Sequence, residues 1–129
     1  MGDVVVDSSV LIDHLRGSPA ATRFLERLER EGTVYVPALV AWELWMGAIT
    51  PRRRSGILEL LSALVVDPFT AALAELAGDV HRRLAVNGRP PPTYDLLISA
   101  HALHRDIPLV TKDRDYRLIP GLKLLAIEH

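Results

Sequence analysis

The chain has 129 residues, no cysteine and a formal net charge of −1, which fits one domain and excludes disulfides, thiolate zinc sites and cysteine nucleophiles. A near-neutral chain does not attract nucleic acid by overall charge, and an aromatic content of 5% disfavours a base-stacking platform. No apolar run approaches the ~18 residues of a membrane span, and the first residues do not resemble a signal peptide. We therefore expect a single domain over residues 1–129 that is cytoplasmic and contacts no membrane.

Short β-branched runs alternate with helical patterns along the chain. A strand is expected at residues 4–6, and the following helix can be capped by Ser8 or Ser9 and ends at Gly17. Ser18 precedes a second helix, with proline at its first position. The other strands are expected at residues 33–36, 65–66, 107–111 and 123–127, and the other helices at 37–50, 52–64, 71–86 and 94–105.

This alternation predicts the fold class. Strands that alternate with helices form a parallel sheet covered by helices, an α/β sandwich. Before the last helix, Arg89 to Pro92 is expected to form a stiff, extended connection, after which Thr93 caps the helix. No internal repeat or linker interrupts the pattern, which supports one domain.

Acidic residues follow two of the predicted strands. Asp7 comes after the first strand, and Asp113 comes two residues after Thr111, with Asp115 just beyond. In an open α/β sheet, ligands bind outside the carboxyl ends of the strands. We therefore expect these acids at one edge of the sheet, where a ligand would lie.

Two further acids stand in apolar surroundings. Glu43 is the only charged residue between Pro37 and Arg52, and Asp95 opens an apolar helix whose next acid is Asp106. A lone charge in such surroundings is costly to bury unless something pairs with it. Both carboxylates therefore require a specific reason to be there.

Asp7, Glu43, Asp95 and Asp113 would form a strongly negative cluster if the fold brings them together. Carboxylates at close range resist joint ionisation, and a hard divalent cation removes this conflict. Mg²⁺ and Mn²⁺ prefer oxygen ligands, and Mg²⁺ is commonly shared between carboxylates and substrate phosphates. Because a metal-bound water can attack a phosphodiester, the four acids predict a metal-dependent site for a polyanionic substrate.

Each acid also has an ordinary structural explanation. Asp7 could cap a helix, Glu43 could lie on a narrow exposed stripe, and Asp95 could simply favour a helix N-terminus. Asp113 and Asp115 could belong to a turn. The joint arrangement, rather than any single residue, supports the metal-site hypothesis.

Other residues receive mainly structural interpretations. Trp42 and Trp45 are expected in the core or at a subunit interface. Arg52, Arg53 and Arg54 form the densest basic patch, expected at a solvated helix start, with contact to RNA phosphates as the alternative. No acid or thiol at metal spacing accompanies the helix histidines, which are expected to be solvated: His81, His101 and His104.

The motifs, in this order, resemble a known family. Residues 5–13 (VVDSSVLID), 42–48 (WELWMGA), 94–103 (YDLLISAHAL) and 109–116 (LVTKDRDY) are similar to four successive motifs of the PIN domain family, and more narrowly of VapC toxins from VapBC toxin–antitoxin pairs. Residues 119–122 (IPGL) follow, as is common in VapC-like chains. The resemblance spans nearly the whole chain and departs at Tyr116, where phenylalanine is frequent.

The resemblance implies a fold, an activity and partners. The fold would be a single PIN domain with a parallel five-stranded sheet between helices. The activity would be that of an endoribonuclease that uses Mg²⁺ or Mn²⁺, leaves 5′-phosphate ends and acts as the toxin of a type II toxin–antitoxin module. The chain would form a homodimer, and a small VapB-like antitoxin would insert a segment into the active-site groove and silence it.

The resemblance also assigns roles to residues. Thr111 and Ser9 would support the carboxylates through hydrogen bonds, and Asp115 would be a further neighbour of the metal. The catalytic, metal-binding acids would be Asp7, Glu43, Asp95 and Asp113.

Other functions compete with a nuclease. A haloacid dehalogenase phosphatase needs an acid two residues after its first Asp, where this chain has Ser9. A receiver domain needs its Lys beyond a later strand than its Thr, whereas Thr111 and Lys112 are adjacent. A catalytically silent PIN fold that binds RNA or protein is the third alternative, and the presence of all four acids disfavours it.

Overall fold

The structure, a computed structural model, describes residues 2–88 and 92–127, so the predicted connection over residues 89–91 lies outside the described residues. The strands are β1 Val4–Val6, β2 Val34–Pro37, β3 Val65–Asp67, β4 Leu109–Val110 and β5 Leu124–Leu125. The helices are α1 Ser8–Leu15, α2 Pro19–Glu31, α3 Ala38–Met46, α4 Pro51–Ala63, α5 Ala71–Val86 and α6 Thr93–Arg105, with a short 3-10 helix, η1, at Arg114–Leu118. Among the described residues, no helix has the length and apolar character to cross a membrane.

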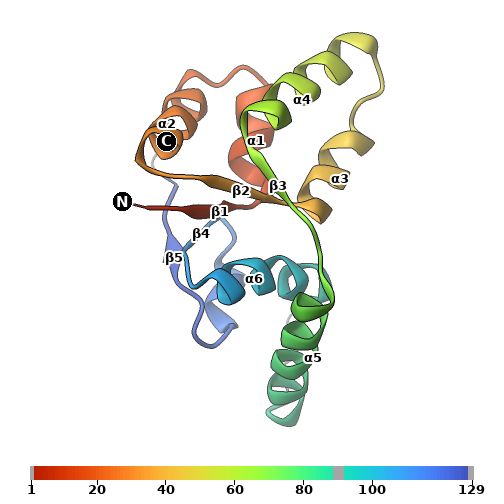
Figure 1. The fold of residues 1–129 in the computed structure, drawn as a ribbon, viewed down its shortest axis with the longest axis vertical. Helices are drawn as coiled ribbons and strands as arrows, with labels where there is room; N and C mark the ends of the chain where they lie inside the picture. The colour runs from red at the N-terminus through yellow and green to blue at the C-terminus, as the bar shows by residue number, and fades with distance from the viewer. Residues whose placement is uncertain (1, 89–91, 128–129) are drawn as a thin grey trace.

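The five strands form one parallel sheet in the order β3-β2-β1-β4-β5. At its centre, Val5 of β1 pairs with Tyr35 of β2 on one side and Leu109 of β4 on the other. Helices α1 to α4 lie on one face of the sheet, and α5 and α6 lie on the other (Figure 1). The predicted α/β sandwich with a parallel five-stranded sheet is therefore confirmed.

The central strand β1 is covered on both faces. Val4, Val5 and Val6 are at most 1% exposed. A parallel strand with helices on both sides has an apolar residue at every position, which explains the unbroken run of valines. Because β1 and β4 are parallel neighbours, the polar residues that follow them emerge at the same edge of the sheet.

The helix predicted over residues 37–50 is shorter than expected and ends at Met46. Thr50 instead caps α4, because its backbone is extended and its Oγ1 accepts a hydrogen bond from the Arg53 N–H at 3.1 Å. A residue that begins one helix in this way cannot continue the preceding one. Residues 47–50 therefore connect two helices instead of extending the first.

The other differences are at element ends. Thr93 is the first residue of α6 and does not cap it, since the N-cap position is occupied by Pro92. The strand predicted over residues 107–111 is reduced to Leu109–Val110, and the strand predicted over 123–127 is reduced to Leu124–Leu125. These short strands suffice to place Thr111 directly after β4.

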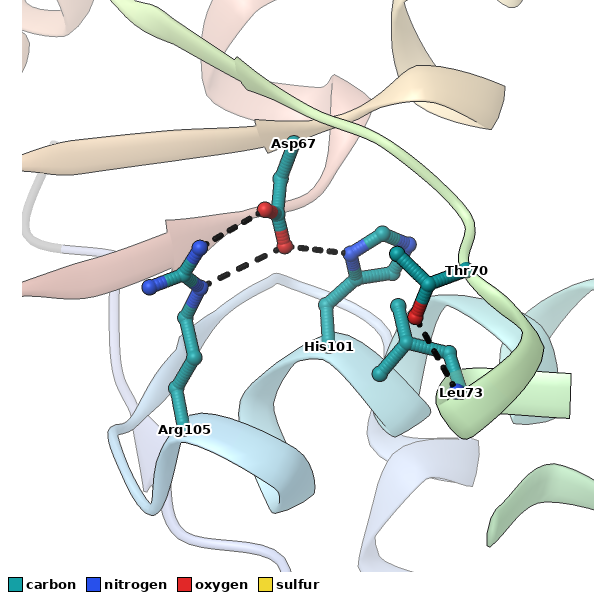
Figure 2. Close-up of polar contacts among 5 residues, drawn as sticks. All are labelled: Asp67, Thr70, Leu73, His101 and Arg105. Atoms are coloured by element: carbon teal, nitrogen blue, oxygen red, sulfur yellow. Dashed lines mark hydrogen bonds and ion pairs between the residues drawn. The ribbon is translucent and has the colours of Figure 1, made fainter. Parts of the chain in front are cut away.

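A polar cluster, formed by the buried Asp67 and His101 and the more exposed Arg105, joins α6 to the edge of the sheet (Figure 2). The carboxylate of Asp67 accepts hydrogen bonds from His101 Nδ1 at 2.7 Å and from Arg105 Nη2 at 2.8 Å. The Arg105 guanidinium also lies over the ring of Tyr35 in β2, 3.8 Å from its centroid. His101 is 0% exposed, so the prediction that it is solvated is wrong.

The two ring nitrogens of His101 have different surroundings. Nδ1 faces the Asp67 carboxylate, whereas Nε2 is buried and has no hydrogen-bond partner among the described residues. A proton on Nδ1 satisfies the carboxylate and leaves no unpaired N–H in the core. Burial acts to raise the pKa of Asp67, but hydrogen bonds from Arg105 and His101 outweigh it, so that this pKa lies below its ordinary value.

Asp67→Asn should lower the free energy of unfolding at neutral pH by about 2–3 kcal/mol, because a partly buried guanidinium loses its charged partner. Since the native pKa of Asp67 is lowered, this stabilisation is present above the unfolded pKa of about 4 and is lost as the pH falls through the native pKa. Urea unfolding should therefore show the gap between variant and wild type shrinking below pH ~4. Asp79→Asn, which breaks an exposed pair with Arg82, should cost less than about 1 kcal/mol, and equal losses for both variants would contradict the prediction.

Candidate metal centre

Three of the predicted acids meet at one edge of the sheet. Carboxylate oxygens of Asp95, Asp113 and Asp115 lie within 4.8 Å of one another. Asp95 is in the first turn of α6, Asp113 is the N-cap of η1, and Asp115 lies in the first turn of η1. The carboxyl end of β4 and the beginning of α6 thus bring together acids from two separate motifs.

Asp7 stands at the carboxyl end of β1 and is the N-cap of α1. Its backbone is extended and its carboxylate accepts the Ser8 N–H, so the prediction that Ser8 or Ser9 caps this helix is wrong. Asp7 is buried, and this burial raises its pKa. Hydrogen bonds from Thr111 and Ser8 lower that pKa and the charge of Glu43 raises it, with a net increase.

Thr111 connects the two strand ends. Its Oγ1 donates to Asp7 Oδ2 at 2.7 Å and accepts the Asp113 N–H at 3.0 Å. Because the Asp113 N–H occupies a lone pair of the hydroxyl, the hydroxyl hydrogen is directed at Asp7. One side chain thereby fixes the Asp7 carboxylate relative to the loop that carries Asp113.

Asp95 belongs to the same electrostatic cluster. Burial raises its pKa, and the negative charges of Asp113 and Asp7 raise it further. A hydrogen bond from Tyr116 acts in the opposite direction, and the charge of Asp115 again raises the pKa. Burial is the largest cause of the net increase, and repulsion from the neighbouring carboxylates adds to it.

Glu43 reaches the cluster from α3. Its negative charge acts on Asp7, and its carboxylate is hydrogen bonded to the hydroxyl of Tyr94. The Tyr94 hydroxyl also lies 3.4 Å from the Leu39 carbonyl oxygen, so Tyr94 connects the start of α6 to α3. Asp7, Glu43, Asp95, Asp113 and Asp115 are called the acid cluster below.

Two tyrosines at the acid cluster were missed by the sequence reasoning. Burial raises the pKa of both Tyr94 and Tyr116, and the charges of Asp7 and Asp95 raise it further, so both phenols stay protonated donors. The signal for Tyr116 is its spacing of three from Asp113, because a 3-10 helix places such residues on one side. Its hydroxyl provides a hydrogen bond to Asp95 that lowers the pKa of that carboxyl.

Two other predictions lack such contacts. The Ser9 Oγ is buried and has no hydrogen-bond partner among the residues that the structure describes, so its supporting role stays a prediction. Arg52, Arg53 and Arg54 are exposed at the start of α4, and the Arg54 guanidinium lies 5.0 Å from the centroid of the Trp45 ring. No described contact joins this run to the acid cluster.

The donor set of the acid cluster fits a hard divalent cation. Every donor is a carboxylate oxygen, the ligand type that Mg²⁺ and Mn²⁺ prefer. Burial raises the pKa values of Asp7 and Asp95, and the like charges near them raise these values further, a repulsion that a cation would offset. When bound, such an ion lowers the pKa of a coordinated water and stabilises negative charge on a phosphate.

Comparisons with known proteins agree with this geometry. The family profile described as "PIN domain" matches residues 4–122. The chain is 36% identical to ribonuclease VapC10 of Mycobacterium tuberculosis over 108 residues, which are 84% of this chain and 80% of that protein. It is 29% identical to the tRNA(fMet)-specific endonuclease VapC of Shigella flexneri over 125 residues, 92% of this chain and 93% of that protein.

The fold also matches solved structures. VapBC2 from Rickettsia felis, bound to a DNA fragment from its promoter, has a chain that superposes with a TM-score of 0.87. The match covers 98% of this chain and 99% of that one at 23% identity, so it supports the fold alone. Since the family profile spans residues 4–122 and a relative 36% identical to the chain covers 84% of it, this chain belongs to the PIN domain family.

Proposed function

We propose that this chain is a metal-dependent endoribonuclease that hydrolyses RNA phosphodiester bonds, as the cytoplasmic toxin of a type II toxin–antitoxin module. The observation that carries the proposal is the acid cluster at the carboxyl edge of the sheet, where Asp95, Asp113 and Asp115 lie within 4.8 Å of one another. Relatives named ribonuclease and endonuclease support RNA as the substrate. A catalytically silent binding module would not need acidic side chains that lie so close to one another.

In this proposal Asp7, Glu43, Asp95 and Asp113 hold Mg²⁺ or Mn²⁺, with Asp115 beside them. The bound ion supplies an activated water and offsets negative charge on the scissile phosphate. The protein keeps the ligands in place, because Thr111 orients Asp7 and the Tyr94 phenol orients Glu43. Since both phenols at the site stay protonated, they donate hydrogen bonds to carboxylates and add no further negative charge.

The purified chain, free of any antitoxin, should cut total cellular RNA at discrete sites with Mg²⁺ or Mn²⁺, leaving 5′-phosphate ends. EDTA should abolish cleavage, and Asp7→Asn should slow it at least about a hundredfold, because several kcal/mol of charge stabilisation depend on the ion. Sequencing of the cut ends measures both rate and position. Asp79→Asn, which changes an acid on the surface of α5, should cleave like the wild type.

Cleavage that survives Asp7→Asn would contradict the proposed site. A wild-type chain that neither cuts RNA nor binds Mn²⁺ in calorimetry would favour the alternative, a catalytically silent PIN-fold module that binds RNA or protein.

Thr111→Val should weaken Mn²⁺ binding about tenfold, because it preserves the shape of the side chain and removes the hydrogen bond that orients Asp7. Isothermal calorimetry of the metal titration measures this loss. Thr111→Ser keeps the hydroxyl and should retain an affinity close to that of the wild type. Equal Mn²⁺ affinities for the valine and serine variants would show that the hydroxyl does not support the site.

A VapB-like antitoxin is the proposed partner that silences the nuclease. The support is the similarity to VapBC2 from Rickettsia felis, a complex whose toxin-like chain has this fold. In the proposal, a segment of the antitoxin lies over the acid cluster and denies RNA access to it. RNA is thus the proposed substrate, and the antitoxin the proposed regulator, of the same acid cluster.

The chain is further proposed to form a homodimer, supported by an apolar stripe along α3 and just beyond it. Trp42, Met46 and Ile49 are 53%, 54% and 74% exposed. Large apolar side chains that share one exposed stripe commonly mark an interface between proteins. Trp42, predicted in the core or at an interface, is therefore assigned to an interface.

Trp42→Glu should convert the dimer into a monomer, because it places a charge in the apolar stripe, where burial without a partner costs several kcal/mol. Light scattering gives the mass in solution. Val86→Glu changes another exposed apolar residue, on α5, and should leave the dimer intact. A monomeric wild-type chain, or a dimeric Trp42→Glu variant, would contradict the assignment.

A further inference from the structure

We infer that Arg114 and Arg117 form the contact for the RNA backbone beside the acid cluster, an assignment that rests on the proposed ribonuclease function. The need for such a contact follows from charge. The chain carries a formal net charge of −1, and the acid cluster repels phosphates. Because affinity for RNA comes largely from cations that neutralise phosphates, positive side chains must stand close to the acids.

The geometry of η1 separates acids from cations. A 3-10 helix has three residues per turn, so residues three apart share one side. Asp113 and Tyr116 share the side that faces the acid cluster, where Tyr116 is buried and hydrogen bonded to Asp95. Arg114 and Arg117 share another side and are exposed.

The two arginines lie together along η1. The Arg117 Nε donates a hydrogen bond to the Arg114 carbonyl oxygen at 3.3 Å. This contact holds the Arg117 side chain along the helix, on the side of Arg114. The result is a pair of cations on one side of a short element whose two neighbouring sides carry Asp113 and Asp115 of the acid cluster.

The segment that carries the arginines is fixed to the rest of the site. Lys112 forms an ion pair with Asp13 of α1, and the Asp113 carboxylate accepts the Asp115 N–H at 2.9 Å. Thr111 accepts the Asp113 N–H, as described above. Since Lys112 is engaged by Asp13, the contact with RNA is assigned to the arginines.

Both arginines keep the terminal nitrogens of the guanidinium available, although the Nε of Arg117 is engaged by the Arg114 carbonyl oxygen. Neither Arg114 nor Arg117 forms an ion pair with any residue in the described ranges 2–88 and 92–127, and a guanidinium can bind a phosphate through two parallel hydrogen bonds. Some other cations among the described residues are engaged in ion pairs, such as Arg82 with Asp79, Arg105 with Asp67, and Lys123 with Asp106.

The run Arg52–Arg54 is the competing candidate for the RNA contact. It stands at the start of α4, and Arg54 lies over the ring of Trp45. Arg114, in contrast, is the residue between Asp113 and Asp115, two members of the acid cluster. A phosphate next to the scissile one therefore comes within reach of η1, and we assign the contact there.

The inference is tested by RNA binding in the Asp7→Asn background, where cleavage is suppressed. Fluorescence anisotropy with a labelled single-stranded RNA of mixed sequence, in Mg²⁺ buffer at several salt concentrations, gives the affinity and its salt dependence. Adding Arg114→Gln and Arg117→Gln should weaken binding about tenfold and reduce the slope of log Kd against log salt by about 0.7 for each lost phosphate contact. Arg82→Gln with Arg83→Gln on α5 removes the same formal charge and should stay within about twofold of the parent.

Three further readouts separate an RNA contact from a structural role. In the cleaving chain, the Arg114→Gln, Arg117→Gln variant should raise KM for RNA with little change in kcat. Its Mn²⁺ affinity in calorimetry should not weaken, because no carboxylate is altered. Its unfolding temperature should match that of the wild type, because both side chains are exposed.

Each contrary outcome is distinct. Unchanged RNA affinity and salt slope in the η1 variant would overturn this inference, as would a loss of binding confined to a variant with Arg52, Arg53 and Arg54 changed to glutamine. Both results leave the proposed ribonuclease function intact if the wild-type chain cuts RNA. A wild-type chain that does not cut RNA, together with an Asp7→Asn chain that does not bind it, would overturn both proposals.

Discussion

The mutual repulsion of carboxylates at one sheet edge is the constraint on which the rest of the structure depends. The parallel sheet ends β1 and β4 at that edge, and it also makes helices begin there. Asp7 caps α1, Asp95 lies in the first turn of α6, and Asp113 caps η1. Since a helix N-terminus offers free N–H groups and the positive end of the helix dipole to an anion, the backbone offsets part of this repulsion, which adds to burial in raising the pKa values of Asp7 and Asp95.

Capping a helix and binding a metal are compatible roles for one carboxylate. In Asp7, Oδ1 accepts the Ser8 N–H and Oδ2 accepts the Thr111 hydroxyl. An ionised carboxylate has about four lone-pair sites, so these two bonds leave acceptor capacity for a cation. The structural and the functional explanation of Asp7 compete when the sequence is considered alone. In the structure they are compatible, because the hydrogen bond by which Asp7 caps α1 also orients its carboxylate as a proposed metal ligand.

Local patterns predict local structure here, and partners distant in sequence limit what can be predicted. The helix at residues 71–86 has the predicted bounds because its apolar periodicity and the signals at its ends depend only on residues close in sequence. The burial of His101 was missed because its partner, Asp67, lies 34 positions earlier on another element. Asp7 and Asp113 could be predicted because both follow strands, and the carboxyl ends of parallel strands meet at one edge of the sheet. The helix η1 was expected only as a turn, so the position of Tyr116 on its inward side was not predicted.

The near-neutral net charge is consistent with an RNA substrate when the positions of the charged side chains, and not only their sum, are taken into account. A globally basic surface would bind RNA at many places, and only a small part of that binding would present a phosphodiester to the acid cluster. Here two acids and two arginines lie within residues 113–117, and the three-residue period of η1 places Asp113 and Arg114 on different sides. A phosphate held by the arginines would then lie beside the cation held by the acids. Opposite charges placed close together on one short element therefore provide the alignment that a large net charge could not.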